Sequence, residues 1–209
     1  MSSQKTALLS ASNKDGLGTF AGELTKLGWN LLASAGTAKY LAERGTQAKD
    51  VAEIVGPPIL GHRVVTLSRE LHAALLATDS EADQAELVRL GVPRIDLVYV
   101  NLYPLQAEIA NPDHTLKSVI EKTDIGGPTL LRSAAKGRRI ALCRPTEFDM
   151  ALDFIRGRYR GVIRDQVFVS AFTVIAEREI AAYCAASADF HQGMVIGDTD
   201  FTQTFPNFF

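Results

Sequence analysis

The chain is poor in cysteine, which limits the redox and metal chemistry available to it. Only two of its 209 residues are cysteines, Cys143 and Cys184. Both lie in apolar contexts and lack the spacing of metal ligands. We therefore expect buried, reduced thiols, with no disulfide and no metal site.

The chain also lacks long apolar runs and an excess of charge of one sign. No run approaches the roughly 20 apolar residues of a membrane span, and the N-terminal stretch MSSQKTALLS has no signal-peptide core. We therefore expect a cytoplasmic protein that does not bind a membrane. The net charge of -2 provides no basic field for nucleic acid, so we expect no nucleic-acid partner. Any anion site has to be built locally.

What the chain does have is a regular alternation of short apolar runs and amphipathic segments of helical length. This pattern is typical of strands and crossover helices around a parallel sheet. The expected strands are residues 6–10, 29–34, 50–56, 95–103 and 139–143. The expected helices are residues 17–27, 36–45, 69–77, 83–91, 129–136, 147–155 and 164–186, whereas residues 197–209 show no helical pattern. We predict one α/β domain over residues 1–209, with a doubly wound, mainly parallel sheet and a helical C-terminal segment.

Polar residues follow three of these strands, at the edge where such a fold binds its ligand. The segments are residues 10–14, 34–37 and 101–103. Hydroxyl groups, exposed backbone amides and helix N-termini are the groups that a phosphate monoester requires. The candidate phosphate ligands in the first two segments are Ser10, Ser12, Lys14, Ser34, Gly36 and Thr37. The alternative is ordinary helix capping, because Ser and Thr favour that position anyway.

Three further residues can complete such a site. Arg63 can clamp a phosphate with two parallel hydrogen bonds, although it can equally be a surface arginine. Asn101 and Tyr103 can bond a polar heterocycle, and the competing interpretation of Tyr103 is packing in the core.

The stretch KTDIGGPTLLRSAAKG, residues 122–137, joins an acid, two glycines and two cations. Pro128 suits the first turn of a helix, and loop glycines expose backbone amides. Asp124, Arg132 and Lys136 are then expected to converge near the helix N-terminus, where an anion is held or a carboxylate is tuned. The alternative is that Asp124 caps the helix and the two cations are solvated.

Six stretches of the chain together form a family pattern: LLSASNK, LLASAGTAKYLAERG, DVAEIVG, NLYP, TDIGGPTLLRSAAKG and SAFTVIAEREIAAYCA. In their order and spacing the chain resembles the inosine monophosphate cyclohydrolase domain of the bifunctional purine biosynthesis enzyme. The resemblance covers about residues 6–186 and leaves a divergent tail over about 187–209. It implies a methylglyoxal-synthase-like fold, a ribonucleotide substrate, no cofactor and a homodimer.

The resemblance also implies a reaction and a set of roles. The carboxamide nitrogen of a formamidoimidazole carboxamide ribotide attacks the formyl carbon, and loss of water gives inosine monophosphate. Asp124 with Lys136 resembles the proton-transfer pair, and Tyr103 and Asn101 belong to the catalytic, base-side pocket. The implied phosphate and nucleotide contacts are Ser10, Ser12, Lys14, Ser34, Gly36, Thr37, Arg63, Thr66, Ile125, Gly126 and Gly127.

The chain departs from the family pattern at several positions. Val65 replaces a lysine of the family, and Ser68 and Arg69 replace a histidine and a proline. The sequence SNKDG replaces the family's SDKTG. The formyltransferase half is expected to be absent, which implies a separate formyltransferase. A cyclohydrolase diverted to a related substrate is the close variant. A non-catalytic nucleotide-binding or regulatory module is the alternative, and methylglyoxal synthase itself is disfavoured by the NLYP and DIGGPTLLRSAAK motifs.

Overall fold

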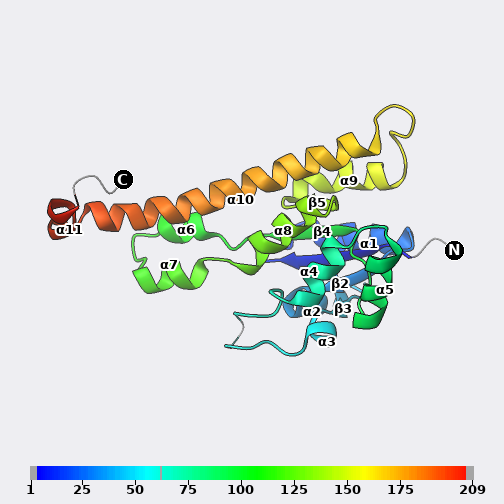
Figure 1. The fold of residues 1–209 in the computed structure, drawn as a ribbon, viewed down its shortest axis with the longest axis horizontal. Helices are drawn as coiled ribbons and strands as arrows, with labels where there is room; N and C mark the ends of the chain where they lie inside the picture. Colours follow the sequence, from blue (N-terminus) through cyan, green and yellow to red (C-terminus); the bar gives the residue numbers. More distant parts are fainter. Residues whose placement is uncertain (1–3, 62, 206–209) are drawn as a thin grey trace. The chain divides into compact units, whose positions relative to one another are not determined.

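The computed structural model describes residues 4–61 and 63–205, and these divide into two compact units. Unit 1 comprises Met1–Leu102 and Ile125–Glu177, and unit 2 comprises Tyr103–Asp124 and Arg178–Phe209. The prediction of a single domain stays a prediction. Figure 1 labels the helices and strands of both units.

Within the described residues, unit 1 contains one parallel sheet of five strands. In chain order the elements of unit 1 are β1 (Thr6–Ala11), α1 (Leu17–Lys26), β2 (Asn30–Ala33), α2 (Ala35–Ala42), β3 (Lys49–Asp50), α3 (Ala52–Val55), α4 (Arg69–Leu76), α5 (Glu81–Leu90), β4 (Leu97–Asn101), α8 (Gly126–Lys136), β5 (Ile140–Leu142), the 3-10 turn η1 (Pro145–Glu147), α9 (Phe148–Ile155) and the first part of α10 (Asp165–Ile196). The strand order is β3-β2-β1-β4-β5, so the chain winds outward from β1 in both directions.

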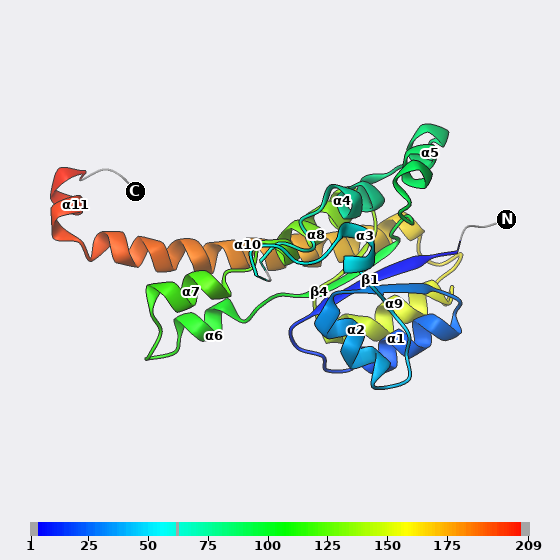
Figure 2. The same cartoon turned by 90° about the horizontal axis from the view of Figure 1, so that it is seen from below.

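Helices cover both faces of this sheet, which confirms the doubly wound α/β prediction. Figure 2 shows α4, α5 and α8 on one side of the strands and α1, α2 and α9 on the other. Successive side chains of a strand point to opposite faces. Leu9 and Tyr99 accordingly pack with Phe20 of α1 and Phe148 of α9, whose rings stack 4.2 Å apart. β4 is buried from Leu97 to Val100, as expected for a strand covered on both faces.

Unit 2 is helical. Its elements are α6 (Leu105–Ile109), α7 (Leu116–Lys122), the C-terminal part of α10 and α11 (Thr199–Thr204). Thr115 and Ser118 form a reciprocal capping box that starts α7. The ring of His114 lies edge-on to Phe190 of α10, with centroids 5.6 Å apart. α10 runs for 32 residues, yet in the described part of the chain no helix combines the length and apolarity that crossing a membrane requires.

The predictions for the third strand and for the C-terminal tail are wrong in part. The strand expected over 50–56 ends at Asp50, and α3 follows. The Asp50 carboxylate accepts a hydrogen bond from the Ala52 backbone N–H at 2.9 Å, and Glu53 accepts one from the Asp50 N–H, so local bonds favour a helical turn. The tail expected to be irregular contains α11, because the Asp198 side chain caps it through the Phe201 N–H. Residues 206–209 of that tail lie outside the described part.

The environment of the cysteines also differs from the prediction. Cys143 is buried as expected, but Cys184 is exposed. It follows the inward-facing Tyr183 on α10, and consecutive residues of a helix point about 100° apart. α10 itself continues to Ile196, ten residues beyond the predicted end, through a stretch that contains no proline.

Gly137 provides a test of how closely α4 and α8 approach one another. A Cβ atom added there would lie well under 3.0 Å from the backbone oxygen of Leu75. We expect Gly137→Ala to lower the free energy of unfolding by about 3 kcal/mol, because a backbone atom cannot easily move away. Urea denaturation measures the loss. Gly22→Ala, whose Cβ would meet only the Thr46 hydroxyl at 4.0 Å, is the control, and equal stabilities of the two variants would contradict the close approach.

Candidate active site

The carboxyl ends of β1, β2 and β4 lie at one edge of the sheet. Leu9 is paired with Ala33 of β2, and Ser10 with Val100 of β4. The segments that follow these strands therefore meet, as the sequence predicted for residues 10–14, 34–37 and 101.

Three hydroxyl groups form a cluster at this edge. The Ser10 hydroxyl donates to the Ser34 hydroxyl at 3.2 Å, which in turn donates to the Thr37 hydroxyl at 3.2 Å. The backbone N–H of Ala11 also donates to Thr37, whose side chain is 1% exposed. Both bonds use the Thr37 oxygen as acceptor, so its hydroxyl proton remains available to another acceptor. We call Ser10, Ser34 and Thr37 the hydroxyl cluster.

The capping alternative does not describe Ser34. It occupies the N-cap position of α2, but its side chain makes no capping hydrogen bond. Its hydroxyl belongs to the hydroxyl cluster instead. Gly36 follows in the first turn of α2, and an added Cβ there would meet nothing within 4 Å. The N-terminal turn of α2 is therefore open to a ligand at Gly36.

Lys14 supplies a cation next to the hydroxyl cluster. Its ammonium donates to the backbone oxygens of Ala11 at 3.3 Å and Ser12 at 3.5 Å. The Tyr40 ring lies 5.9 Å from this ammonium, and the Tyr40 hydroxyl donates to the Lys14 backbone oxygen. Among the described residues no carboxylate pairs with Lys14, so its charge is not neutralised by the protein. Sequence reasoning did not identify Tyr40.

Asn101 holds the loop that follows β1. Its side-chain oxygen accepts hydrogen bonds from the Ser12 hydroxyl at 2.7 Å and the Asn13 backbone N–H at 2.9 Å. The Ser12 hydroxyl also reaches the backbone oxygen of Leu102 at 2.9 Å. These bonds assign Ser12 and Asn101 a positioning role, and the catalytic role predicted for Asn101 stays a prediction.

Arg63, Thr66 and Val65 lie in the connection between α3 and α4. This connection contains one isolated antiparallel bridge, between Ile59 and Val64. Arg63 is exposed, whereas Val65 and Thr66 are half-buried. Thr66 makes no hydrogen bond to the hydroxyl cluster in the described structure, so its phosphate-binding role stays a prediction, as does that of Arg63.

The expected convergence of cations at the start of α8 is wrong. Ile125 is the N-cap, and Gly126 and Gly127 form the first turn of α8, so the prediction of loop glycines before a helix that begins at residue 129 is wrong. Lys136 is the last residue of α8, about 15 Å along the helix axis from Gly126 at 1.5 Å per residue. Arg132 forms an ion pair with Glu177 of α10. The helix thus carries these cations away from its own N-terminus.

Unit 2 contains Tyr103 and Asp124. Tyr103 is 47% exposed, so the alternative of core packing is wrong. The backbone N–H of Asp124 donates to the Tyr183 hydroxyl at 2.7 Å, and that hydroxyl donates to the backbone oxygen of Lys122 at 3.0 Å. Burial raises the pKa of Tyr183 to about 12, so the hydroxyl stays protonated and keeps both bonds near neutral pH. Tyr183 therefore fixes the backbone on both sides of Thr123.

Sequence reasoning did not single out Tyr183, although it quoted the motif that contains it. A tyrosine in a helix of alanines is compatible with simple packing. Only its partners, 59 and 61 residues away in the sequence, give its hydroxyl a role.

The described residues contain no cluster of three or more His, Cys, Asp or Glu side chains that could hold a metal ion. The hydroxyl cluster and the Lys14 ammonium are donors of the kind that bind an anion.

A doubly wound sheet with a polar cluster beyond its carboxyl edge defines an α/β ligand-binding or catalytic domain. Residues 16–129 match the model of the MGS-like domain family, which is more than half of the chain. The chain belongs to the MGS-like domain family.

Curated relatives confirm the resemblance inferred from the motifs. Bifunctional purine biosynthesis protein PurH of Bacillus cytotoxicus is 43% identical over 153 residues, which are 71% of this chain and 30% of that protein. PurH of Elusimicrobium minutum is 38% identical over 91% of this chain and 38% of its own length. PurH of Anoxybacillus flavithermus is 37% identical over 94% of this chain and 38% of its own. The chain thus spans 30% to 38% of the length of these relatives.

A solved structure shows the same fold. The crystal structure of ForH matches this chain with a TM-score of 0.75 and 33% identity. The match covers 90% of this chain and 100% of that chain.

Removing the Tyr183 hydroxyl tests whether it fixes the segment before α8. We expect Tyr183→Phe to speed hydrogen exchange at the Asp124 amide, because that N–H loses its acceptor. Mass spectrometry or NMR measures the exchange, with Tyr159→Phe as the matched control. Unchanged protection at Asp124 in a folded Tyr183→Phe protein would assign Tyr183 to packing alone.

Proposed function

We propose that this domain is a cyclohydrolase that closes a ring on a formamidoimidazole carboxamide ribotide or a closely related ribonucleotide, giving inosine monophosphate or an analogue. The single observation that carries the proposal is the hydroxyl cluster with the unneutralised Lys14 at the carboxyl edge of the sheet. The similarity to PurH proteins, which are named for purine biosynthesis, points to the same substrate class.

The chemistry of a phosphate monoester fits this edge. Its oxygens carry nearly two negative charges and accept hydrogen bonds from hydroxyls, an ammonium and the amides of a helix N-terminus. Lys14 donates only to neutral backbone oxygens, and an incoming phosphate is a better acceptor for its charge. The open space at Gly36 lets an anion approach the first turn of α2.

The proposed reaction forms one bond and releases one water. The carboxamide nitrogen attacks the formyl carbon, and Asp124 takes a proton from that nitrogen. Asp124 then gives this proton to the formyl oxygen, which becomes a hydroxyl and leaves the carboxylate ionised again. This hydroxyl leaves as water with the proton of the formamido nitrogen, which creates the C=N bond of the new ring. Tyr103 and the backbone amides of Gly126 and Gly127 are proposed to stabilise negative charge on the formyl oxygen.

Lys136 is proposed to act through its positive charge. It is the last residue of α8, and its ammonium group is proposed to stabilise negative charge in the transition state. Its role rests on the match to the family motif and is tested independently of Asp124.

Three accompanying predictions concern the context of this activity. They are a homodimer, a cytoplasmic location and a separate formyltransferase that supplies the substrate. The prediction of a formyltransferase follows from the similarity to PurH proteins, which are described as bifunctional.

The activity is tested by incubating the purified chain with the formylated ribotide and recording purine absorbance. We expect Asp124→Ala and Lys136→Ala each to slow ring closure by about 10²–10⁴-fold while inosine monophosphate still binds. The reason is that Asp124 is proposed to transfer a proton and Lys136 to stabilise charge in the transition state. Calorimetry gives the binding. Equal losses of rate and binding would show that both residues have a structural role. A parent protein that binds the nucleotide without turnover would support the alternative of a nucleotide-binding module.

For the phosphate site we expect a loss of nucleotide binding as the primary effect, not a loss of rate with binding retained. Lys14→Ala should weaken inosine monophosphate by about tenfold or more and leave inosine unchanged, because only the nucleotide carries the phosphate. Calorimetry with both ligands measures this, and Lys39→Ala, an exposed cation on α2, is the control. If the parent protein binds the nucleotide no more tightly than the nucleoside, the proposed phosphate site is wrong.

A substitution at Val65 distinguishes two hypotheses, that the substrate is the purine precursor or that it is a related compound. If the substrate is the purine precursor, Val65→Lys should raise turnover, because the ammonium restores a charge near the developing oxyanion. If the site has been refitted, the half-buried ammonium should be neutral or harmful. Thermal unfolding checks that the variant is folded. A folded variant without inosine monophosphate synthesis, from a parent that also has none, would reject the purine assignment.

A further inference from the structure

A cleft lies at the edge of the sheet opposite the hydroxyl cluster, at the amino ends of the strands. It has a volume of about 630 Å³, and its lining belongs entirely to unit 1. Lys5 precedes β1, Asp96 precedes β4 and Arg139 precedes β5, so these residues mark the edge away from the hydroxyl cluster. The volume lies within the range of about 300–1,000 Å³ typical of small-molecule sites. We call it the amino-edge cleft.

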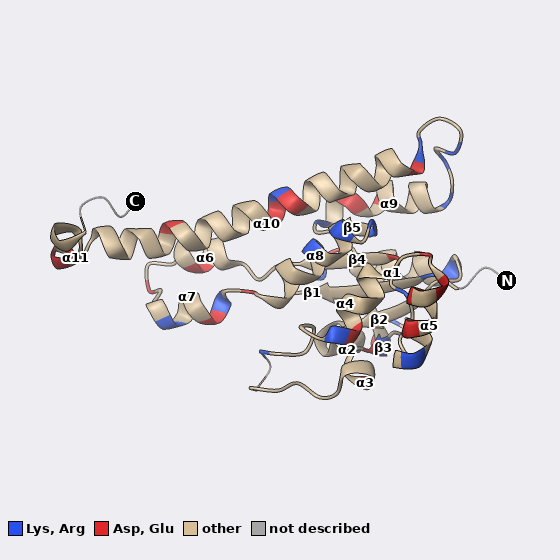
Figure 3. Cartoon of the chain, in the orientation of Figure 1, with Lys and Arg blue, Asp and Glu red and all other residues tan. Residues whose placement is uncertain are grey.

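Basic side chains outnumber acidic ones in this cleft, although the whole chain has a net charge of -2. Figure 3 shows basic residues gathered beside β5 and in the connection between α9 and α10. The basic lining residues are Lys5, Arg94, Arg138, Arg139 and Arg160, and the acidic ones are Asp79, Asp96 and Asp165.

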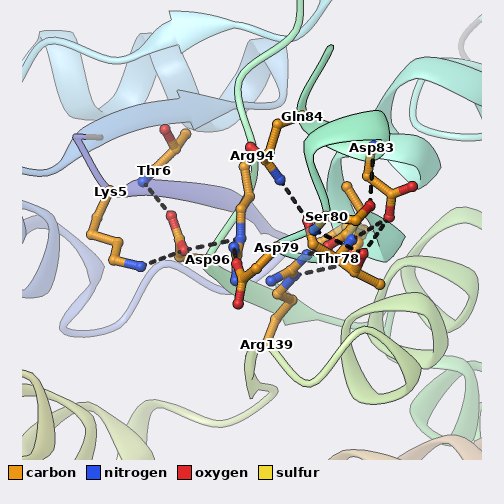
Figure 4. Close-up of polar contacts among 12 residues, drawn as sticks. Lys5, Thr6, Thr78, Asp79, Ser80, Asp83, Gln84, Arg94, Asp96 and Arg139 are labelled. Carbon is orange, nitrogen blue, oxygen red and sulfur yellow. Dashed lines mark hydrogen bonds and ion pairs between the residues drawn. The ribbon is translucent and has the colours of Figure 1, made fainter. Parts of the chain in front are cut away.

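Two of these cations are neutralised within the protein. The Lys5 ammonium lies 2.8 Å from the Asp96 carboxylate, as Figure 4 shows. Arg94 pairs with Asp79, and its Nε lies 3.5 Å from Asp96. The Asp96 carboxylate also accepts a hydrogen bond from the Thr6 backbone N–H at 3.2 Å. This network uses the charge of both carboxylates.

The other three cations bond only to neutral groups or to none. Arg139 is 4% exposed, and its guanidinium donates to the backbone oxygens of Leu75 at 2.8 Å and of Ala77. Arg138 donates to the Gln166 backbone oxygen at 3.0 Å and the Ser170 hydroxyl at 3.2 Å. None of the three, Arg160 included, forms an ion pair with a carboxylate of the described residues.

An unneutralised arginine at the bottom of a cleft is costly without an anion. Neutral carbonyl oxygens satisfy some N–H groups of Arg139 but leave its net charge in place. Guanidinium groups match phosphate oxygens in geometry and bond them in pairs. Asp79 and Asp96 also attract Arg139 through space, but both are already paired with Arg94 or Lys5. With Asp165 at the start of α10, the lining holds three carboxylates against five cations.

We propose that the amino-edge cleft binds a polyphosphate-bearing small molecule, held by Arg138, Arg139 and Arg160. This site is distinct from the hydroxyl cluster and does not rest on the proposed cyclohydrolase activity. β1 alone separates the two edges by about 20 Å, at 3.3 Å per residue over six residues.

Trp29 makes the test specific to this cleft. It is the only tryptophan of the chain and lines the amino-edge cleft, so its fluorescence reports on this site. Adenosine diphosphate is the probe and adenosine the uncharged comparison, both at constant ionic strength. We expect a saturable change of Trp29 emission with the diphosphate and none with adenosine.

Matched arginine variants complete the experiment. Arg160→Gln and Arg138→Gln should each weaken the diphosphate by about tenfold, because each removes a charge-assisted hydrogen bond. Arg158→Gln removes the same charge two residues from Arg160, but Arg158 pairs with Asp153 and does not line the cleft, so affinity should stay unchanged. Lys14→Ala should not alter the Trp29 response either.

Three outcomes would overturn the proposal. They are no saturable response in the parent protein, equal affinity in the Arg138→Gln, Arg160→Gln and Arg158→Gln proteins, and loss of the response in Lys14→Ala. The last would show that the diphosphate acts from the hydroxyl cluster. Both arginines are exposed, so their replacement is compatible with folding, which circular dichroism verifies.

Discussion

The pairing of β1 with both β2 and β4 is the constraint on which the candidate site depends. β1 is the strand from which the chain winds outward in both directions, so the segments beyond its carboxyl end lie at the switch point of the sheet. The bonds from Ser10 to Ser34 and from Ser12 to Asn101 each cross from β1 or its loop to a neighbouring strand end. A register slip of one residue would separate these partners and turn buried side chains to the wrong face. The apolar interior of the sheet thus specifies the polar geometry at its edge.

The end of α4 is held more firmly than the loop that precedes the helix. Arg139 and the close approach of Gly137 both act on the backbone near Leu75, and His72 bonds the Ser133 hydroxyl of α8 at 2.8 Å. The preceding connection, which carries Arg63 and Val65, has one isolated β-bridge and half-buried or exposed side chains. Substitutions in this connection therefore disturb little of the core. This explains how the chain can depart from the family pattern there while the hydroxyl cluster stays intact.

Sequence patterns predicted the sheet because its apolar runs are short, separated by turns and buried on both faces. They also predicted the hydroxyl cluster, since Ser and Thr directly after parallel strands must share an edge. Features that depend on distant or competing bonds were not predictable. The role of Tyr183 needs partners some 60 residues away, and α11 depends on a cap by Asp198 in a segment without helical periodicity. The error over Lys136 had a different origin, because four-residue spacing indicates a common helix face but not a common helix end.

Both proposed anion sites have to act locally in a chain whose net charge is -2. At physiological ionic strength, charges are screened over about 8 Å, which is shorter than the span of about 20 Å that β1 places between the edges. An anion at the amino-edge cleft therefore has little direct electrostatic influence on a phosphate at the hydroxyl cluster. Any coupling between them has to pass through the packed strands or through α4, whose C-terminal end accepts the hydrogen bonds of Arg139. Interiors packed at crystal-like density transmit small displacements, and α4 bonds Arg139 at its C-terminal end while its N-terminal end follows the connection that carries Val65.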